Sequence, residues 1–203
     1  GRRERASCPH RHGRDQQVSF TVPTIEWAGL APVLIILGAG VLGVLIEAFV
    51  PRRGRLQVQA GLSVLAILGS GVAFVLRWAQ VLPQDPGTGR VSPSGRVLAS
   101  GVSEDPFGVA AQGIMLVIGL LAVLVMADRT TAGDGAFAAQ AADRPGSAEE
   151  TESLHHGWTA TEVFPLTLFS LAGMMLFPMV NNVIALFVVL ELVSLPLYIM
   201  AAT

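Results

Sequence analysis

Long runs without a charged residue dominate the pattern of hydrophobic and polar positions along the chain. These runs cover residues 27–46, 56–76, 107–127, 163–190 and 192–203. A helix rises about 1.5 Å per residue, so roughly 20 apolar residues cross the hydrocarbon core of a membrane. The block from 163 onward is long enough for two crossings, and the cluster of Pro178, Asn181 and Asn182 is the natural place to divide it.

This pattern predicts an all-α fold, a polytopic bundle of about five transmembrane helices joined by polar loops. The runs lack the alternation of polar and apolar residues that strands of a membrane barrel show. The membrane domain is expected to occupy 26–203. Its helices are expected near residues 27–50, 56–78, 107–127, 161–180 and 183–203.

The polar segments between and before these runs are predicted to be irregular. Residues 1–25 read as a polar, disordered tail, and 128–160, rich in Ala, Gly, Asp and Glu, reads as a flexible loop. The stretch 77–106 contains several prolines and glycines that favour turns, so it is predicted to be a loop as well.

Composition supports a membrane protein and excludes some other classes. Of the 203 residues, 52% are hydrophobic and 14% are charged, which indicates the lipid bilayer as a partner. The net charge of -2, without a long basic block, argues against nucleic-acid binding. Arginines at 52, 53, 55 and 129 favour a cytoplasmic side for the loops that follow the first and third helices, but those at 77, 90 and 96 argue the other way, so charge alone leaves the orientation open.

Glu191 is the acid expected deep within an apolar span, about eight residues into the fifth helix. An ionised carboxylate at that depth is costly unless it faces a polar partner or water, so it is a candidate proton-relay residue. The alternative is a glutamate that only seals a contact between helices by hydrogen bonding.

Three further residues follow Glu191 on the same helix. Ser194 and Tyr198 are candidate polar neighbours of the acid. Pro196 lacks the N–H that would bond the carbonyl of Leu192, and it either kinks the helix beside the acid or is tolerated without a functional role.

Two other acids lie near the ends of expected helices. Glu47 is a weaker candidate for the site, because its expected role is to reach the membrane interface or to pair with Arg52 or Arg53. Asp105 precedes Pro106 at the start of the third helix and is expected to cap its N-terminus.

The sequence predicts no metal site and no phosphate-binding loop. Cys8, His10 and His12 lie within five residues in the tail without a fourth ligand. His155 and His156 are expected at the interface. The glycines of the first helix do not form a phosphate loop and are expected to allow close helix packing; they are Gly38, Gly40 and Gly43.

The stretch from Asn182 to Tyr198, NVIALFVVLELVSLPLY, resembles subunit N of the proton-pumping NADH-quinone oxidoreductases, bacterial respiratory complex I. That family shows a Leu-Glu-Leu-x-Ser-Leu core on one apolar helix, preceded by a helix similar to the segment FSLAGMML at 169–176. Related antiporter-like subunits share the glutamate but differ in the residues after it. The resemblance covers about 25–203.

The resemblance implies a membrane subunit that contributes to proton translocation coupled to electron transfer from NADH to quinone. In the family, the glutamate on the fifth helix pairs with a lysine on the next helix, and later lysines relay protons; this chain contains no lysine, so only Glu191 is carried over and the chain alone is expected to be inactive. The implied partners are other membrane subunits in the cell inner (plasma) membrane. NAD, flavin, iron-sulfur clusters and quinone are expected in other subunits, and no cofactor in this chain.

Two alternatives of other classes remain open at this point. One is a cation/proton antiporter subunit that works without a redox partner. The other is a structural membrane subunit whose glutamate only supports helix packing. The sequence does not say which quinone is used or whether sodium replaces the proton.

Overall fold

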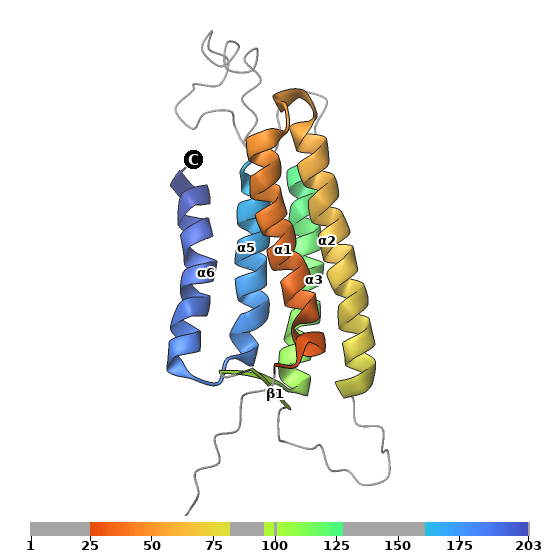
Figure 1. The fold of residues 1–203 in the computed structure, drawn as a ribbon, viewed down its shortest axis with the longest axis vertical. Coiled ribbons are helices and arrows are strands. Elements are labelled where there is room, and N and C mark those ends of the chain that lie inside the picture. Colours follow the sequence, from red (N-terminus) through yellow and green to blue (C-terminus); the bar gives the residue numbers. More distant parts are fainter. Residues whose placement is uncertain (1–24, 82–95, 100, 128–160, 203) are drawn as a thin grey trace, which may run out of the picture.

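Five α-helices, a 3₁₀ turn and a two-stranded hairpin make up the residues that the computed structural model describes, which are 25–81, 96–99, 101–127 and 161–202 (Figure 1). The helices run side by side along the long axis of the molecule. The predicted all-α bundle is therefore confirmed. The helices are α1 (Trp27–Phe49), α2 (Arg52–Val81), α3 (Pro106–Ala127), α5 (Val163–Leu176) and α6 (Val183–Ala202).

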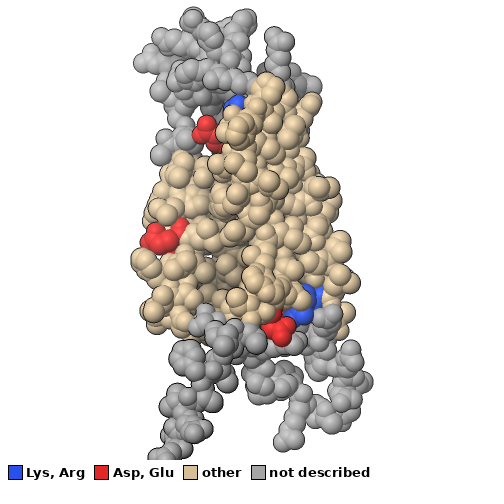
Figure 2. Space-filling view, viewed as in Figure 1, with Lys and Arg blue, Asp and Glu red and all other residues tan. Residues whose placement is uncertain are grey.

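Four of these helices are long and apolar enough to cross a membrane. They are α1, α2, α3 and α6, whereas α5 with the turn that follows it forms a shorter apolar stretch, Val163–Met179. Charged side chains of the described residues gather toward the two ends of the bundle, and an almost uncharged band lies between them (Figure 2). This distribution is that of a multi-pass membrane protein.

The core of the bundle is built around α5. This helix packs against α1, α3 and α6 and also touches α2. Leu168, Ala172 and Met175 have no exposed surface. Glycines on α1 contribute to the close packing: a side chain added at Gly40 would meet the ring of Phe169, and one at Gly43 would meet Pro165. The expected packing role thus holds for two of the three glycines, since Gly38 has no neighbour within 4 Å among the described residues.

The chain turns at the proline and asparagine cluster between α5 and α6. The 3₁₀ turn η1 (Phe177–Met179) ends α5, and the N–H of Asn181 then donates to the carbonyl of Gly101 at 3.0 Å. Asn182 begins the next helix, because its side-chain oxygen accepts a 2.7 Å hydrogen bond from the N–H of Ala185. That bond satisfies one of the free donors in the first turn of α6.

The prediction of a loop over 77–106 is wrong in part. Helix α2 continues to Val81, and β1 (Arg96–Ala99) pairs antiparallel with β2 (Val102–Glu104). The hairpin turns at Gly101, whose φ of +98° is a conformation that side chains other than glycine rarely adopt. The hairpin lies under the ends of the helices in Figure 1, and the carbonyl of Leu98 accepts from the N–H of Glu26 at 2.9 Å.

Helix starts differ from the expected positions by a few residues. Helix α2 begins at Arg52, earlier than the expected start near residue 56. The N-cap predicted at Asp105 is confirmed, since its Oδ1 accepts a 2.6 Å hydrogen bond from the N–H of Gly108. The tail up to residue 24 and the expected loop at 128–160, with their cysteine and histidines, lie outside the described residues.

Candidate functional site

Glu191 lies near the middle of α6, as the sequence predicts. Its side chain is half-buried. Figure 2 shows acidic atoms at mid-height on the side where α6 runs in Figure 1, and Glu191 is the acid that the sequence of α6 contains. Within the described residues it has no hydrogen-bond or ion-pair partner.

Glu191 occupies the side of α6 that faces away from α5. The contacts with α5 involve Val193, whose carbonyl accepts from Ser170 at 3.4 Å, and Met200, whose sulfur accepts from Thr167 at 3.5 Å. Because successive residues advance by roughly 100° around a helix, Glu191 points about 160° away from Val193. The carboxylate therefore does not point into the part of the bundle formed by α1, α2 and α3.

The remaining side chains on that face of α6 are mostly apolar and exposed. They include Ile184 (79% exposed), Val188 (60%) and Tyr198 (71%). An acid on an apolar face at mid-membrane depth costs about 3 kcal/mol, so a face of this kind requires a polar partner for the carboxylate.

The other sequence-predicted residues of α6 do not bond to the acid. The hydroxyl of Ser194 donates to the carbonyl of Leu190 at 2.6 Å, and no hydrogen bond joins Ser194 or Tyr198 to Glu191 within the described part of the chain. Helix α6 continues without interruption past the buried Pro196 to Ala202. The roles of Ser194 and Tyr198 as polar neighbours stay predictions.

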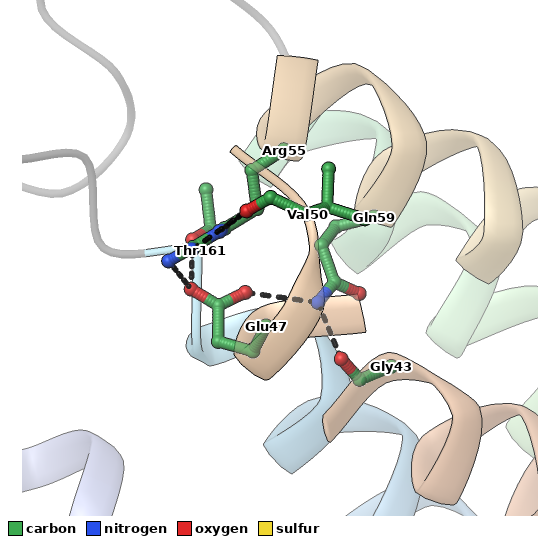
Figure 3. Close-up of polar contacts among 6 residues, drawn as sticks. All are labelled: Gly43, Glu47, Val50, Arg55, Gln59 and Thr161. Carbon is green, nitrogen blue, oxygen red and sulfur yellow. Dashed lines mark hydrogen bonds and ion pairs between the residues drawn. The ribbon is translucent and has the colours of Figure 1, made fainter. Parts of the chain in front are cut away.

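A second carboxylate, that of Glu47, is the centre of a polar cluster near the end of α1 (Figure 3). Its oxygens accept hydrogen bonds from Arg55 (2.9 Å), Gln59 (3.0 Å) and Thr161 (2.6 Å). Arg55 also donates to the carbonyl of Val50 at 2.8 Å and 3.1 Å. We call Glu47, Arg55, Gln59 and Thr161 the Glu47 cluster.

The Glu47 cluster contains an arginine partner that the sequence interpretation did not name. Among the described side chains, the ion pair is made with Arg55, which lies one turn into α2. The side chains of Arg52 and Arg53 lie outside the described part of the structure. Gln59 is 1% exposed, and its position as a polar residue within an apolar run could have marked it in the sequence as a site residue. Thr161 has no comparable feature in the sequence.

A third polar contact lies at the opposite end of the bundle. Arg77 of α2 forms an ion pair with Glu104 of β2, and its Nε donates to the second carboxylate oxygen at 3.2 Å. The side chains are 10% and 3% exposed. The sequence interpretation missed this pair because it placed Glu104 in a loop and did not predict the hairpin that brings it to Arg77.

These three acids differ in what their surroundings allow. The carboxylates of Glu47 and Glu104 each form an ion pair with an arginine. The carboxylate of Glu191 has no hydrogen-bond partner among the described residues, and of the three acids it lies deepest in the apolar band.

Comparison with known proteins shows what the chain is similar to. No protein-family model matches the chain. The chain is 45% identical over 188 residues to the NADH-quinone oxidoreductase subunit N of Beutenbergia cavernae, across 91% of this chain and 34% of that protein. Over the matched residues, the chain is similar to the subunit N proteins.

Other subunit N proteins match over a similar extent. Identity is 43% over 194 residues with subunit N of Mycobacteroides abscessus and 42% over 190 residues with subunit N 3 of Streptomyces griseus. These alignments cover 89% and 91% of this chain, respectively, and 34% and 33% of the two relatives. The resemblance found at residues 182–198 is thereby confirmed, and the chain spans about a third of the length of the curated subunit N proteins it matches.

Proposed function

We propose that this chain is part of a membrane subunit of an NADH-quinone oxidoreductase and contributes to proton translocation coupled to electron transfer from NADH to quinone. The observation that carries the proposal is the 45% identity to a subunit N protein across 91% of the chain. The membrane-spanning helices and the half-buried carboxylate within one of them support it.

In this proposal Glu191 is the proton-relay residue. A cationic group on a neighbouring helix would stabilise its ionised form, and a change in that pairing during quinone reduction elsewhere in the complex would drive proton movement. The exposed face of α6 around Glu191 supports this role, because further helices packed there would supply the polar partner. The matched relatives, about three times as long as this chain, contain enough sequence for such helices.

The proposal places the redox chemistry in other subunits. NAD, flavin, iron-sulfur clusters and quinone would bind there, because a cluster usually needs four cysteine ligands and this chain contains one cysteine, Cys8. The subunit would reside in the inner (plasma) membrane, beside other membrane subunits. Its activity would belong to the assembled complex.

The test is the substitution Glu191→Gln in the assembled complex, in inverted membrane vesicles. NADH-quinone electron transfer and proton uptake are measured together, so that the protons moved per electron can be compared. We expect this ratio to fall while the complex still assembles, because glutamine keeps the shape but cannot ionise. Glu191→Asp, which retains a carboxylate, should recover part of the ratio.

The control is Glu162→Gln, the same chemical change at an exposed acid before α5 that makes no capping hydrogen bond. It should leave both measurements unchanged. An unaltered ratio in Glu191→Gln rejects the relay role and leaves the structural alternative. Proton movement that follows an imposed sodium gradient without NADH would instead favour the antiporter alternative.

A further inference from the structure

An apolar groove lies between α2 and α3, on a side of the bundle remote from Glu191. It encloses about 460 Å³, within the range of roughly 300–1,000 Å³ that small-molecule sites occupy. Ile67 of α2 and Leu116 of α3, 2% and 5% exposed, lie at its base. Val72 and Val117, 63% and 60% exposed, form its rims.

Missing side chains explain why this groove is hollow. Gly71 lines it, and a Cβ atom added there would find no heavy atom within 4 Å. Gly113 of α3 allows the ring of Phe74 to lie directly against the α3 backbone, since a Cβ at Gly113 would stand 2.6 Å from that ring. The absence of a side chain at Gly71 therefore leaves the groove open, and the absence of one at Gly113 lets the ring of Phe74 pack at one end of it.

The chemistry of the groove restricts its occupant to a hydrocarbon. Its lining is almost entirely apolar, so it offers no hydrogen bond to a polar ligand. It opens sideways, between helices that are apolar and long enough to cross the membrane. An unfilled space there would forfeit the dispersion contacts of its lining, whereas a lipid chain would restore them.

The length of the groove favours a single lipid chain over a transmembrane helix as its occupant. On α2 it extends from Ile67 to Leu76, which is about 14 Å at 1.5 Å per residue. Half of a bilayer core is about 15 Å thick. The groove thus has the length of one leaflet, whereas a neighbouring transmembrane helix would need a contact surface along the whole span.

The position of the groove along α2 also agrees with a lipid chain from one leaflet. It begins near the middle of the helix and ends one residue before Arg77, whose ion pair with Glu104 marks the end of the bundle. Trp78 follows, with its ring 5.8 Å from that of Phe74. Tryptophan is enriched at the level of lipid headgroups, where an acyl chain begins.

We propose that the groove between α2 and α3 binds one acyl chain of a phospholipid from the leaflet on the Arg77 side. The headgroup lies near Trp78, and the chain descends past Gly71 to Ile67. This assignment uses only the membrane location of the helices and is independent of the role of Glu191.

The test uses the assembled complex in phosphatidylcholine vesicles that contain a phosphatidylcholine with a photoreactive diazirine in the middle of one acyl chain. After irradiation, labelled residues are mapped by mass spectrometry. Labelling should concentrate on groove residues such as Val72 and Val117. Ile118 is 54% exposed at the same depth on α3 but does not line the groove, so it reports contact with bulk lipid.

Two matched variants identify the groove as the cause. Gly71→Leu fills the space and should lower groove labelling to the level of Ile118, with Ile118 unchanged, because the acyl chain loses its packing contacts there. Gly61→Leu makes the same change on the same helix, also where no atom lies within 4 Å, but outside the groove, and it should have no effect.

Three results would overturn the proposal. Equal labelling of Val117 and Ile118 in the unaltered protein would mean that only bulk lipid touches the groove. Cross-links from groove residues to another polypeptide would assign the groove to a partner helix. Release of bound quinone by Gly71→Leu, with no change in lipid labelling, would assign it to a quinone tail. The labelling pattern of the unaltered protein is decisive even if Gly71→Leu does not assemble.

Discussion

The hydroxyl of Thr161 donates a 2.6 Å hydrogen bond to the carboxylate of Glu47, although 114 positions separate the two residues in the chain. The same carboxylate pairs with Arg55 of α2 at 2.9 Å. One acid therefore joins the end of α1, the first turn of α2 and the approach to α5. This contact fixes three helices at one end of the bundle.

Glu47→Gln should destabilise the protein by about 1.5–3 kcal/mol, the range for hydrogen bonds that involve a charged group. Glutamine keeps the size of the side chain but leaves Arg55 without its ion-pair partner. Thermal unfolding of the purified complex in detergent would measure the effect. Glu162→Gln, at an exposed position, should stay within about 0.5 kcal/mol of the unaltered protein. Equal effects of the two substitutions would contradict the prediction.

The Arg77 and Glu104 pair should show strong coupling. Replacing Arg77 alone by glutamine leaves a carboxylate that is 3% exposed without its ion-pair partner, and we expect a loss of about 3–5 kcal/mol. The double variant with Glu104→Gln should lose less than the sum of the two single variants, because no unpaired charge remains. Unfolding measurements on all four proteins give the coupling, and strictly additive losses would refute it.

Gly173→Ala should weaken the packing of α6 on α5. The added Cβ would stand 2.7 Å from a methyl group of Val193 and 3.1 Å from its backbone nitrogen, which cannot move aside alone. Overpacking of this kind costs about 1–3 kcal/mol. Gly38→Ala is the matched control: it meets no atom within 4 Å and should stabilise by about 0.5–1 kcal/mol through helix propensity. Thermal unfolding should shift in opposite directions for the two variants.

Gly101→Ala should loosen the hairpin from the start of α6. The backbone conformation at φ +98° is strained for alanine, and the new Cβ would stand 2.7 Å from the side-chain nitrogen of Asn182. Hydrogen exchange is the suitable measurement, because the N–H of Asn181 bonds to the carbonyl of Gly101. That amide should exchange faster in the variant, while amides in the middle of α1 keep their rates. An unchanged rate at Asn181 would argue against the strain.

The sequence predicted the features that depend on local pattern. Apolar runs indicated the helices because a bilayer admits few other backbone arrangements. The cap at Asp105 was predictable because the cap and the backbone N–H that it binds lie three residues apart.

Features that depend on distant residues were not predictable in this way. The hairpin was missed because its strands are short, with only Gly101 as a turn signal. The partners of Glu47 were only partly foreseen. An arginine nearby was expected, but the position of Arg55 depends on where α2 begins, and Thr161 approaches only once α5 packs against α1. The depth of Glu191 in the membrane could be predicted by counting residues along the helix. The direction of its side chain could not, because it depends on which face of α6 packs against α5.

The shortness of α5 has a mechanical consequence. At 14 residues it measures about 21 Å, less than the thickness of the hydrocarbon core, and most of its residues are buried. Helix α5 packs against its neighbours, and α6, the helix that carries Glu191, packs mainly against α5. A displacement of α6 would therefore be transmitted to α1, α2 and α3 mainly through α5, because α5 is the helix that α6 contacts most.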